Sequence, residues 1–99
     1  WMTMSAIFGE LMSFDQEKGP EIKLRVFGDE FYARYETEEG YTAIYDDDLG
    51  LFTYARLEDG LFLSSGLDLS SPPPPDLEKH LEESDEVRLD KAAKRFTRR

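Results

Sequence analysis

Residues 27–55 read FGDEFYARYETEEGYTAIYDDDLGLFTYA, and their pattern is the strongest indication of the architecture. Short apolar and aromatic runs alternate within it with acidic turns that contain glycine. The runs at 30–36, 41–45 and 51–57 are joined by loops too short for crossover connections, so neighbouring strands must pair antiparallel. The stretch therefore predicts a meander of β-strands joined by tight turns.

The same pattern extends toward the N-terminus. Residues 21–27 read EIKLRVF, which places Ile22, Leu24 and Val26 on one face and the basic residues on the other. A period of two residues is typical of a half-buried strand. The preceding Lys-Gly-Pro indicates a turn or loop.

The pattern also continues toward the C-terminus. Asp59 and Gly60 separate two apolar runs, and Asp-Gly in that position is a strong hairpin signal. We therefore predict a mainly β (α+β) fold, in which residues 1–66 form a small antiparallel β-meander or open barrel of five or six strands.

The composition changes beyond this sheet. Residues 67–75 include four consecutive prolines, which exclude a central strand or a helix interior and favour a stiff spacer. Residues 76–99 are predicted to be a helical segment with a basic end, with a short helical turn after Pro75. Ser84 is a good N-cap for the main helix, because acidic residues follow it. Its apolar stripe is narrow and comprises Leu89, Ala92, Ala93 and Phe96.

Length and charge restrict the function. The chain has 99 residues, enough for one small domain, and no cysteine, which excludes disulfides and a thiolate nucleophile. Residues 1–75 carry 15 acidic and 5 basic residues, a net charge of −10, whereas residues 76–99 carry 7 of each. The acidic part should repel nucleic acid and anionic membranes. A cationic protein surface or a metal ion remains compatible with it.

Nothing at the start of the sequence resembles a signal peptide, and no apolar run approaches the roughly 20 residues that span a bilayer. Trp1 ahead of Met2 indicates a trimmed or altered end, from which a leader could have been removed. A chain that starts at Met2 or Met4 would be cytoplasmic.

The paired acids of the turns are poor candidates for catalysis. A carboxylate needs burial or a like-charged neighbour in a cleft to work as a general acid, and turn positions such as Glu38-Glu39 are exposed. No zinc-binding HExxH motif or phosphate-binding glycine loop is present. We expect no enzyme activity and no cofactor. The tyrosines are expected in cross-strand pairs rather than in a ligand platform, and His80 on a solvated helix.

The acidic run at 46–48 raises a metal hypothesis. Asp46 and Asp48 alternate before Gly50, as at the start of a calcium loop. Leu57 occupies the twelfth position, where such loops need a bidentate glutamate. A hairpin turn is therefore the favoured interpretation, and Asp46 and Asp48 remain candidates for weak calcium binding only.

The turn and aromatic spacing resembles the N-terminal pro-region of immune-inhibitor-A-type secreted zinc metalloproteases. The shared elements are Gly-Asp-Glu before an aromatic residue, Thr-x-x-Gly-Tyr, Gly-x-x-x-Tyr-Ala and a final Asp-Gly. They lie here at 28–31, 37–41, 50–55 and 59–60. The tail at 80–99 is similar to the basic helical link that leads to the protease in such precursors.

The resemblance implies a secreted or periplasmic, propeptide-like module that binds a zinc metalloprotease or protease-like domain and restrains it or assists its folding. The catalytic domain itself is absent from this sequence. A cysteine switch is excluded, so an exposed carboxylate such as Asp47 would have to block a zinc site. The alternative is a free-standing adaptor or targeting module that docks on another assembly through its acidic sheet or its C-terminal helix.

Two further surfaces are predicted from the helix. Leu89 and Phe96 are candidate partner-binding residues because their stripe can dock on the sheet or on another protein. Arg98 and Arg99 form a possible processing site, since exposed basic residues suit trypsin-like cleavage. A helix end with complementary charge is the alternative and favoured interpretation of these arginines.

Overall fold

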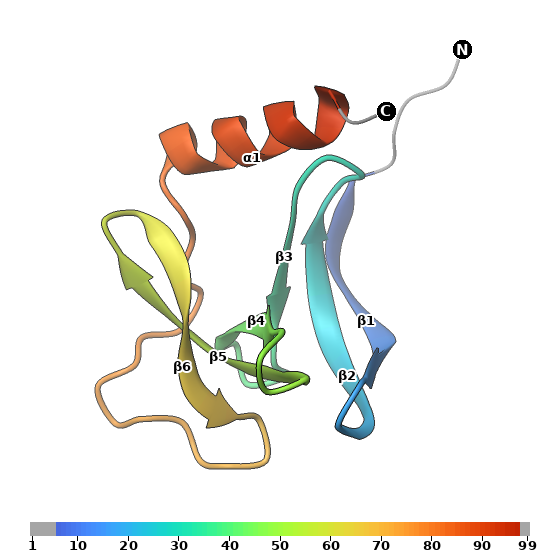
Figure 1. The fold of residues 1–99 in the computed structure, drawn as a ribbon, viewed down its shortest axis with the longest axis vertical. Helices are drawn as coiled ribbons and strands as arrows, with labels where there is room; N and C mark the ends of the chain where they lie inside the picture. The colour runs from blue at the N-terminus through green and yellow to red at the C-terminus, as the bar shows by residue number, and fades with distance from the viewer. Residues whose placement is uncertain (1–5, 98–99) are drawn as a thin grey trace.

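The computed structural model describes residues 6–97, which form one antiparallel sheet and one C-terminal helix (Figure 1). The six strands lie side by side in the order in which they occur along the chain. The sheet is open, with β1 and β6 at its edges, and the predicted mainly β fold is confirmed. The elements are β1 (Ile7–Gln16), β2 (Gly19–Gly28), β3 (Ala33–Glu36), β4 (Thr42–Asp46), β5 (Leu51–Glu58), β6 (Leu61–Asp68) and α1 (Asp85–Thr97).

The turns form where glycine and acidic residues predicted them. Asp59 and Gly60 join β5 to β6 with φ angles of 53° and 78°. Two successive positive φ angles are what a type I′ hairpin turn requires. Gly40, between β3 and β4, has a φ of 100°. A β-carbon there would lie 2.8 Å from the His80 ring, so glycine is needed for space as well as for conformation.

The longest hairpin, β1–β2, is bent. Its register shifts between Phe8 and Glu10 and again between Phe14 and Gln16. Such bulges add a residue to one strand, bend it and increase its twist. Figure 1 shows the result: the β1–β2 hairpin stands away from the β5–β6 hairpin, and the strands between them turn through the curve of the sheet.

The core lies where β2, β4 and β5 meet. Leu24, Ala43 and Phe52 are buried at its centre. Phe14, Tyr35 and Tyr45 pack around Phe52 edge to face, with ring centroids 5.8, 6.0 and 5.0 Å from its own. These aromatic side chains brace the sheet, as expected for tyrosines in cross-strand pairs.

Residues 80–84, the C-terminal strap, bind back to the sheet. The backbone amide of His80 donates to the carbonyl of Gly40 over 2.8 Å, and the amide of Ser84 donates to the carbonyl of Gly60 over 3.0 Å. The hydroxyl of Thr42 donates to the carbonyl of Leu81 over 2.9 Å. The segment beyond the prolines is therefore attached to the β-turns, and β6 itself runs to Asp68, past the predicted boundary at residue 66.

The main helix begins where its sequence signals place it. The hydroxyl of Ser84 accepts a hydrogen bond from the amide of Val87, which confirms Ser84 as the N-cap. The prediction of a short helical turn after Pro75 is wrong. The chain forms a non-helical turn there, in which the amide of Leu77 donates to the carbonyl of Pro74. Among residues 6–97, no helix has the length and apolar character needed to cross a bilayer.

Candidate functional site

The β4–β5 turn is the acidic feature that the structure organises most clearly. Asp46 ends β4, and its carboxylate accepts hydrogen bonds from the amides of Asp48 and Leu49, at 3.0 and 3.1 Å. Its other oxygen accepts the hydroxyl of Ser64 from β6, at 2.7 Å. With both oxygens engaged, Asp46 fixes the turn. Asp47 is exposed on it.

These hydrogen bonds set the titration of Asp46. The hydroxyl of Ser64, and after it the amides of Leu49 and Asp48, hold the pKa of the Asp46 carboxyl below its usual value of 3.8. Each donor stabilises the ionised form, which needs acceptor-only oxygens. Asp46 therefore remains a structural anion over the whole physiological range.

We predict that Ser64→Ala raises the pKa of Asp46 toward its ordinary value, because the hydroxyl is the main cause of the shift. Carboxyl-carbon NMR titration of both proteins measures it. Ser65→Ala is the matched control, since the Ser65 hydroxyl accepts only from the amide of Leu67 and should leave Asp46 unchanged. An Asp46 pKa that is the same in Ser64→Ala and wild type would contradict this account of the turn.

Calcium binding by Asp46 and Asp48 stays a prediction. The flanks of the turn are strands, as expected for a hairpin. Within residues 6–97, no three His, Asp or Glu side chains lie close enough together to hold a metal ion. Any ion bound by Asp46 would have to compete with the three donors that its carboxylate already accepts.

The other turn acids are exposed, as the sequence predicted for Glu38-Glu39 and for the acids at 29–30 and 58–59. Asp29 uses its carboxylate to accept the amides of Phe31 and Tyr32, at 2.9 and 3.1 Å, and so shapes the β2–β3 connection. This is the local hydrogen bonding by which aspartate favours turns.

Sequence reasoning missed two buried carboxylates, of which Glu36 is the first. Its side chain is 1% exposed at the end of β3. It forms an ion pair with Arg34 and lies 2.9 Å from Nδ1 of His80. His80 was expected to be a solvated helix residue; its side chain is 66% exposed, but the helix is wrong, because His80 precedes α1, has a φ of 58° and faces Glu36. Arg34, two residues away on the same strand face, is the signal that could have revealed Glu36.

Glu83 in the strap is the second buried carboxylate and joins three parts of the molecule. It is 3% exposed and accepts the Phe62 amide at 2.7 Å, the Tyr32 hydroxyl at 2.7 Å and the Lys91 ammonium at 2.7 and 2.9 Å. Burial alone would raise the pKa of Glu83, but bonds from Lys91, Phe62 and Tyr32 outweigh it and hold the pKa below its ordinary value. No local pattern marks Glu83, because its partners lie far away in sequence.

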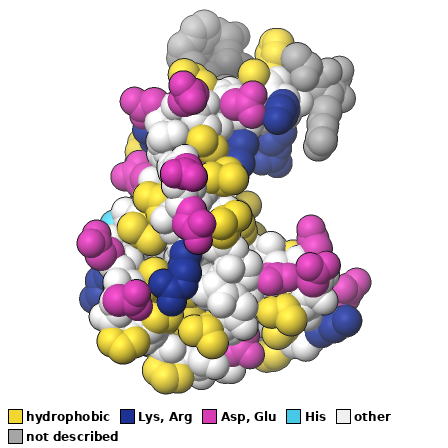
Figure 2. Space-filling model, turned by 60° about the vertical axis from the view of Figure 1, so that its left-hand side comes forward, with side chains coloured by type: hydrophobic (Ala, Val, Ile, Leu, Met, Phe, Trp, Pro, Cys, Tyr) yellow, Lys and Arg dark blue, Asp and Glu magenta, His cyan; other side chains and the backbone are white. Residues whose placement is uncertain are grey.

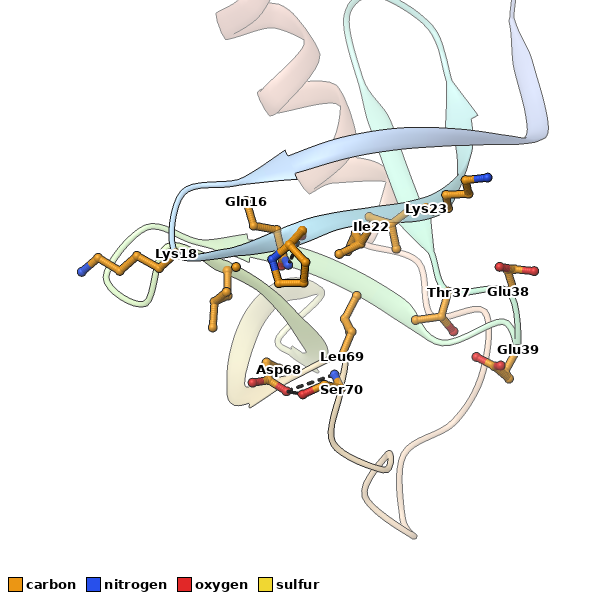
Figure 3. A pocket seen from close by; sticks show the side chains of 14 residues that line it. Gln16, Lys18, Ile22, Lys23, Thr37, Glu38, Glu39, Asp68, Leu69 and Ser70 are labelled. Atoms are coloured by element: carbon orange, nitrogen blue, oxygen red, sulfur yellow. Dashed lines mark hydrogen bonds between the residues drawn. The ribbon is translucent and has the colours of Figure 1, made fainter.

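A cavity of about 410 Å³ opens between the β1–β2 turn, the β3–β4 turn and the end of β6 (Figure 3). Its floor is apolar and includes Ile22, Leu24 and Leu69. Charged side chains surround the rim, with Lys18 on one side and Glu38 and Glu39 on the other. The cavity could accept a small group, and its lining has no histidine or cysteine. The hydroxyl of Ser70 donates to the carboxylate of Asp68 there, over 2.6 Å, and this bond holds the pKa of Asp68 below its usual value of 3.8, so Asp68 is a poor base for activating the hydroxyl.

A second groove lies between α1 and the β2–β3 connection. Leu89, Ala92 and Phe96 line one wall, and Phe31 and Tyr32 line the other. The rings of Phe31 and Phe96 meet with centroids 5.5 Å apart. Two of the three predicted partner-binding residues, Leu89 and Phe96, therefore share one groove.

The remaining predicted residues lie apart from this groove. Asp47 belongs to the β4–β5 turn, which Figure 1 places well away from α1. Arg98 and Arg99, the predicted processing site, lie outside the described residues.

Comparison of this chain with protein-family models, with curated proteins and with solved structures finds no match. The resemblance to metalloprotease pro-regions therefore stays a hypothesis that depends on the turn and aromatic spacing.

Proposed function

We propose that this chain is a non-catalytic module that binds a protein partner through a preformed acidic turn. The observation that carries the proposal is the β4–β5 turn, in which one carboxylate oxygen of Asp46 accepts two backbone amides of the turn and the other accepts the hydroxyl of Ser64. Asp47 is thereby presented on a loop that is already ordered. A preorganised loop loses little conformational entropy on binding, which favours affinity.

The engagement of the acidic side chains supports a non-catalytic role. Glu36 and Glu83 are buried and ion-paired, and Asp46 anchors a turn. A general acid or base needs to reach a substrate from a cleft. These three carboxylates are instead committed to holding the fold together.

The partner class follows from the resemblance: a zinc metalloprotease or protease-like domain. A carboxylate is an effective zinc ligand, and an exposed aspartate on a rigid turn can enter a substrate cleft and occupy the open position of a catalytic zinc. On this proposal the module restrains the protease through Asp47, while the sheet supplies the frame. Figure 2 shows acidic side chains spread over the face of the molecule that it presents, and a net charge of −10 suits a cationic rim around such a cleft.

The test adds the purified chain to the catalytic domain of an immune-inhibitor-A-type metalloprotease and measures binding by calorimetry and inhibition by peptide cleavage. We expect inhibition that Asp47→Asn weakens by about tenfold or more, as for loss of a charged interaction at an interface. Asp59→Asn, at the exposed β5–β6 turn, is the matched control and should inhibit like wild type.

Absence of binding, of inhibition and of any improvement in protease refolding would overturn the proposal. If Asp47→Asn and Asp59→Asn weaken the inhibition equally, Asp47 is not the specific contact, and the binding depends only on the overall negative charge of the module. Capture of a non-protease assembly in place of the protease would favour the adaptor function instead.

A further inference from the structure

The apolar stripe of α1 lies open to solvent. Leu89 is 71% and Phe96 is 64% exposed, and α1 touches the strands at few points. A helix of 13 residues is marginal in water without a packed face. The stripe therefore has more to gain from burial than any other part of the helix.

The groove beside the stripe has room for an apolar element. Its volume is about 690 Å³, more than one side chain fills. Arg88 in its lining is already paired with Asp85 and with Glu82. The other charged group of the lining is Asp29, whose carboxylate accepts two backbone amides of the β2–β3 connection. An amphipathic helix that lays apolar side chains into such a groove is a common recognition mode.

The charges of α1 identify which helix fits. Asp85 and Glu86 occupy its first turn, and Lys94 and Arg95 occupy its last turn. Asp85 is paired with Arg88 and Lys94 with Asp90, so Glu86 and Arg95 carry the net charge of the two turns. A second α1 placed antiparallel sets the acidic turn of each helix against the basic turn of the other, at both ends. A parallel copy would oppose like charges.

The spacing of the stripe agrees with this arrangement. The apolar positions 89, 92 and 96 are three and four residues apart, the interval that keeps a seam facing a second helix. Matching the charged turns centres the pair near residue 90, where Leu89 of one copy meets the small Ala92 of the other. A large side chain packed against a small one lets two helices approach closely.

The overall charge does not prevent this pairing. The net −10 belongs to residues 1–75, while residues 76–99 are balanced. At physiological ionic strength, repulsion beyond about 8 Å is largely screened. Figure 2 shows acidic and basic side chains mixed at the top of the molecule, in keeping with this balance.

We propose that α1 pairs antiparallel with α1 of a second copy of this chain, so that each Leu89–Phe96 stripe fills the groove of the other. This contact is independent of the Asp47 turn, so its test uses the purified chain alone, without a protease.

Sedimentation velocity over a wide range of protein concentrations measures the pairing. We expect a monomer–dimer equilibrium, and an increase of about a hundredfold in the dissociation constant for Leu89→Glu, because one leucine is lost from each copy. Leu63→Glu, an exposed leucine of β6, is the matched control and should dimerise like wild type. Circular dichroism and the melting temperature establish that both variants are folded, as the exposure of the two positions predicts.

Cross-linking tests the orientation. Because the chain has no cysteine, Ala92→Cys introduces a single thiol close to the two-fold axis, and mild oxidation should join two copies. In Asp85→Cys the two thiols would lie about 15 Å apart along the helices, from a rise of about 1.5 Å per residue, and should not cross-link.

A wild type that stays monomeric at every concentration would overturn the proposal. So would a dimer that Leu89→Glu leaves intact, or one that Leu63→Glu disrupts equally. Efficient cross-linking of Asp85→Cys would overturn the antiparallel orientation. A monomer whose α1 amides become protected from exchange only when the protease is added would assign the groove to that partner instead.

Discussion

Glu83→Ala is expected to lower the free energy of unfolding by about 3 kcal/mol, because it leaves buried donors without an acceptor. The amide of Phe62 and the hydroxyl of Tyr32 both lose their bond, and Lys91 loses its ion pair. In a domain of this size the loss corresponds to a fall in melting temperature of about 12–24 °C. Urea unfolding followed by circular dichroism measures the free energy directly.

Glu78→Ala is the matched control, since Glu78 is exposed in the loop before the strap. It should change the free energy of unfolding by no more than about 0.5 kcal/mol. A loss for Glu83→Ala that is no larger than this control would contradict the role of Glu83 as the link between β6, the β2–β3 connection and α1.

The same carboxylate gives stability a dependence on pH. The pKa of Glu83 is lower in the folded chain than its ordinary value of 4.5, so the folded state binds its proton less readily than the unfolded state. The contribution of Glu83 is complete above 4.5 and is lost as pH falls through the folded pKa. The difference in stability between wild type and Glu83→Gln should therefore shrink on acidification from neutral pH.

Phe52→Ala is expected to cost about 4 kcal/mol, the largest effect of any core truncation here. Phe52 is 6% exposed and three aromatic rings pack against it, so the alanine leaves a cavity and removes three edge-to-face contacts. Against a typical stability of about 5–15 kcal/mol, this loss brings the domain close to unfolding. Thermal and urea unfolding check it.

Phe8→Ala is the comparison for Phe52→Ala, because Phe8 on β1 is 82% exposed. Its expected effect is within about 0.5 kcal/mol. Similar losses at the two positions would contradict the assignment of the core to the meeting point of β2, β4 and β5.

The sheet could be predicted from the sequence because its determinants are local. Alternation in residues 21–27 places Leu24 and Val26 inside, and Asp59-Gly60 makes a turn whose two positive φ angles need those residue types. The N-cap at Ser84 is also a short-range feature. Each of these depends on neighbours within a few positions.

The strap could not be predicted, because its contacts are long-range. The partners of Glu83 are Tyr32, Phe62 and Lys91, and no spacing in the sequence relates them. His80 was expected on a helix because its neighbours suit one. Its position is instead decided by Gly40, whose carbonyl accepts its amide, and by Glu36.

The sequence named the candidate residues of the surfaces but not their positions in the fold. Asp47, Leu89 and Phe96 are exposed, and their role in binding a partner stays a prediction. That Leu89 and Phe96 form a wall opposite Phe31 depends on how the strap sets α1 above the β2–β3 connection.

The sequential strand order has a consequence for synthesis. Because each strand pairs with the one before it, the hairpins can form one after another as the chain leaves the ribosome, without waiting for distant segments. The contacts with the strap are the exceptions: the acceptor of the Phe62 amide is translated 21 residues later, and the hydroxyls of Tyr32 and Thr42 also find their acceptors there. Docking of the strap then follows assembly of the sheet, and a nascent chain stalled before residue 83 would carry a sheet in which the Phe62 amide and the Tyr32 hydroxyl both lack their acceptor.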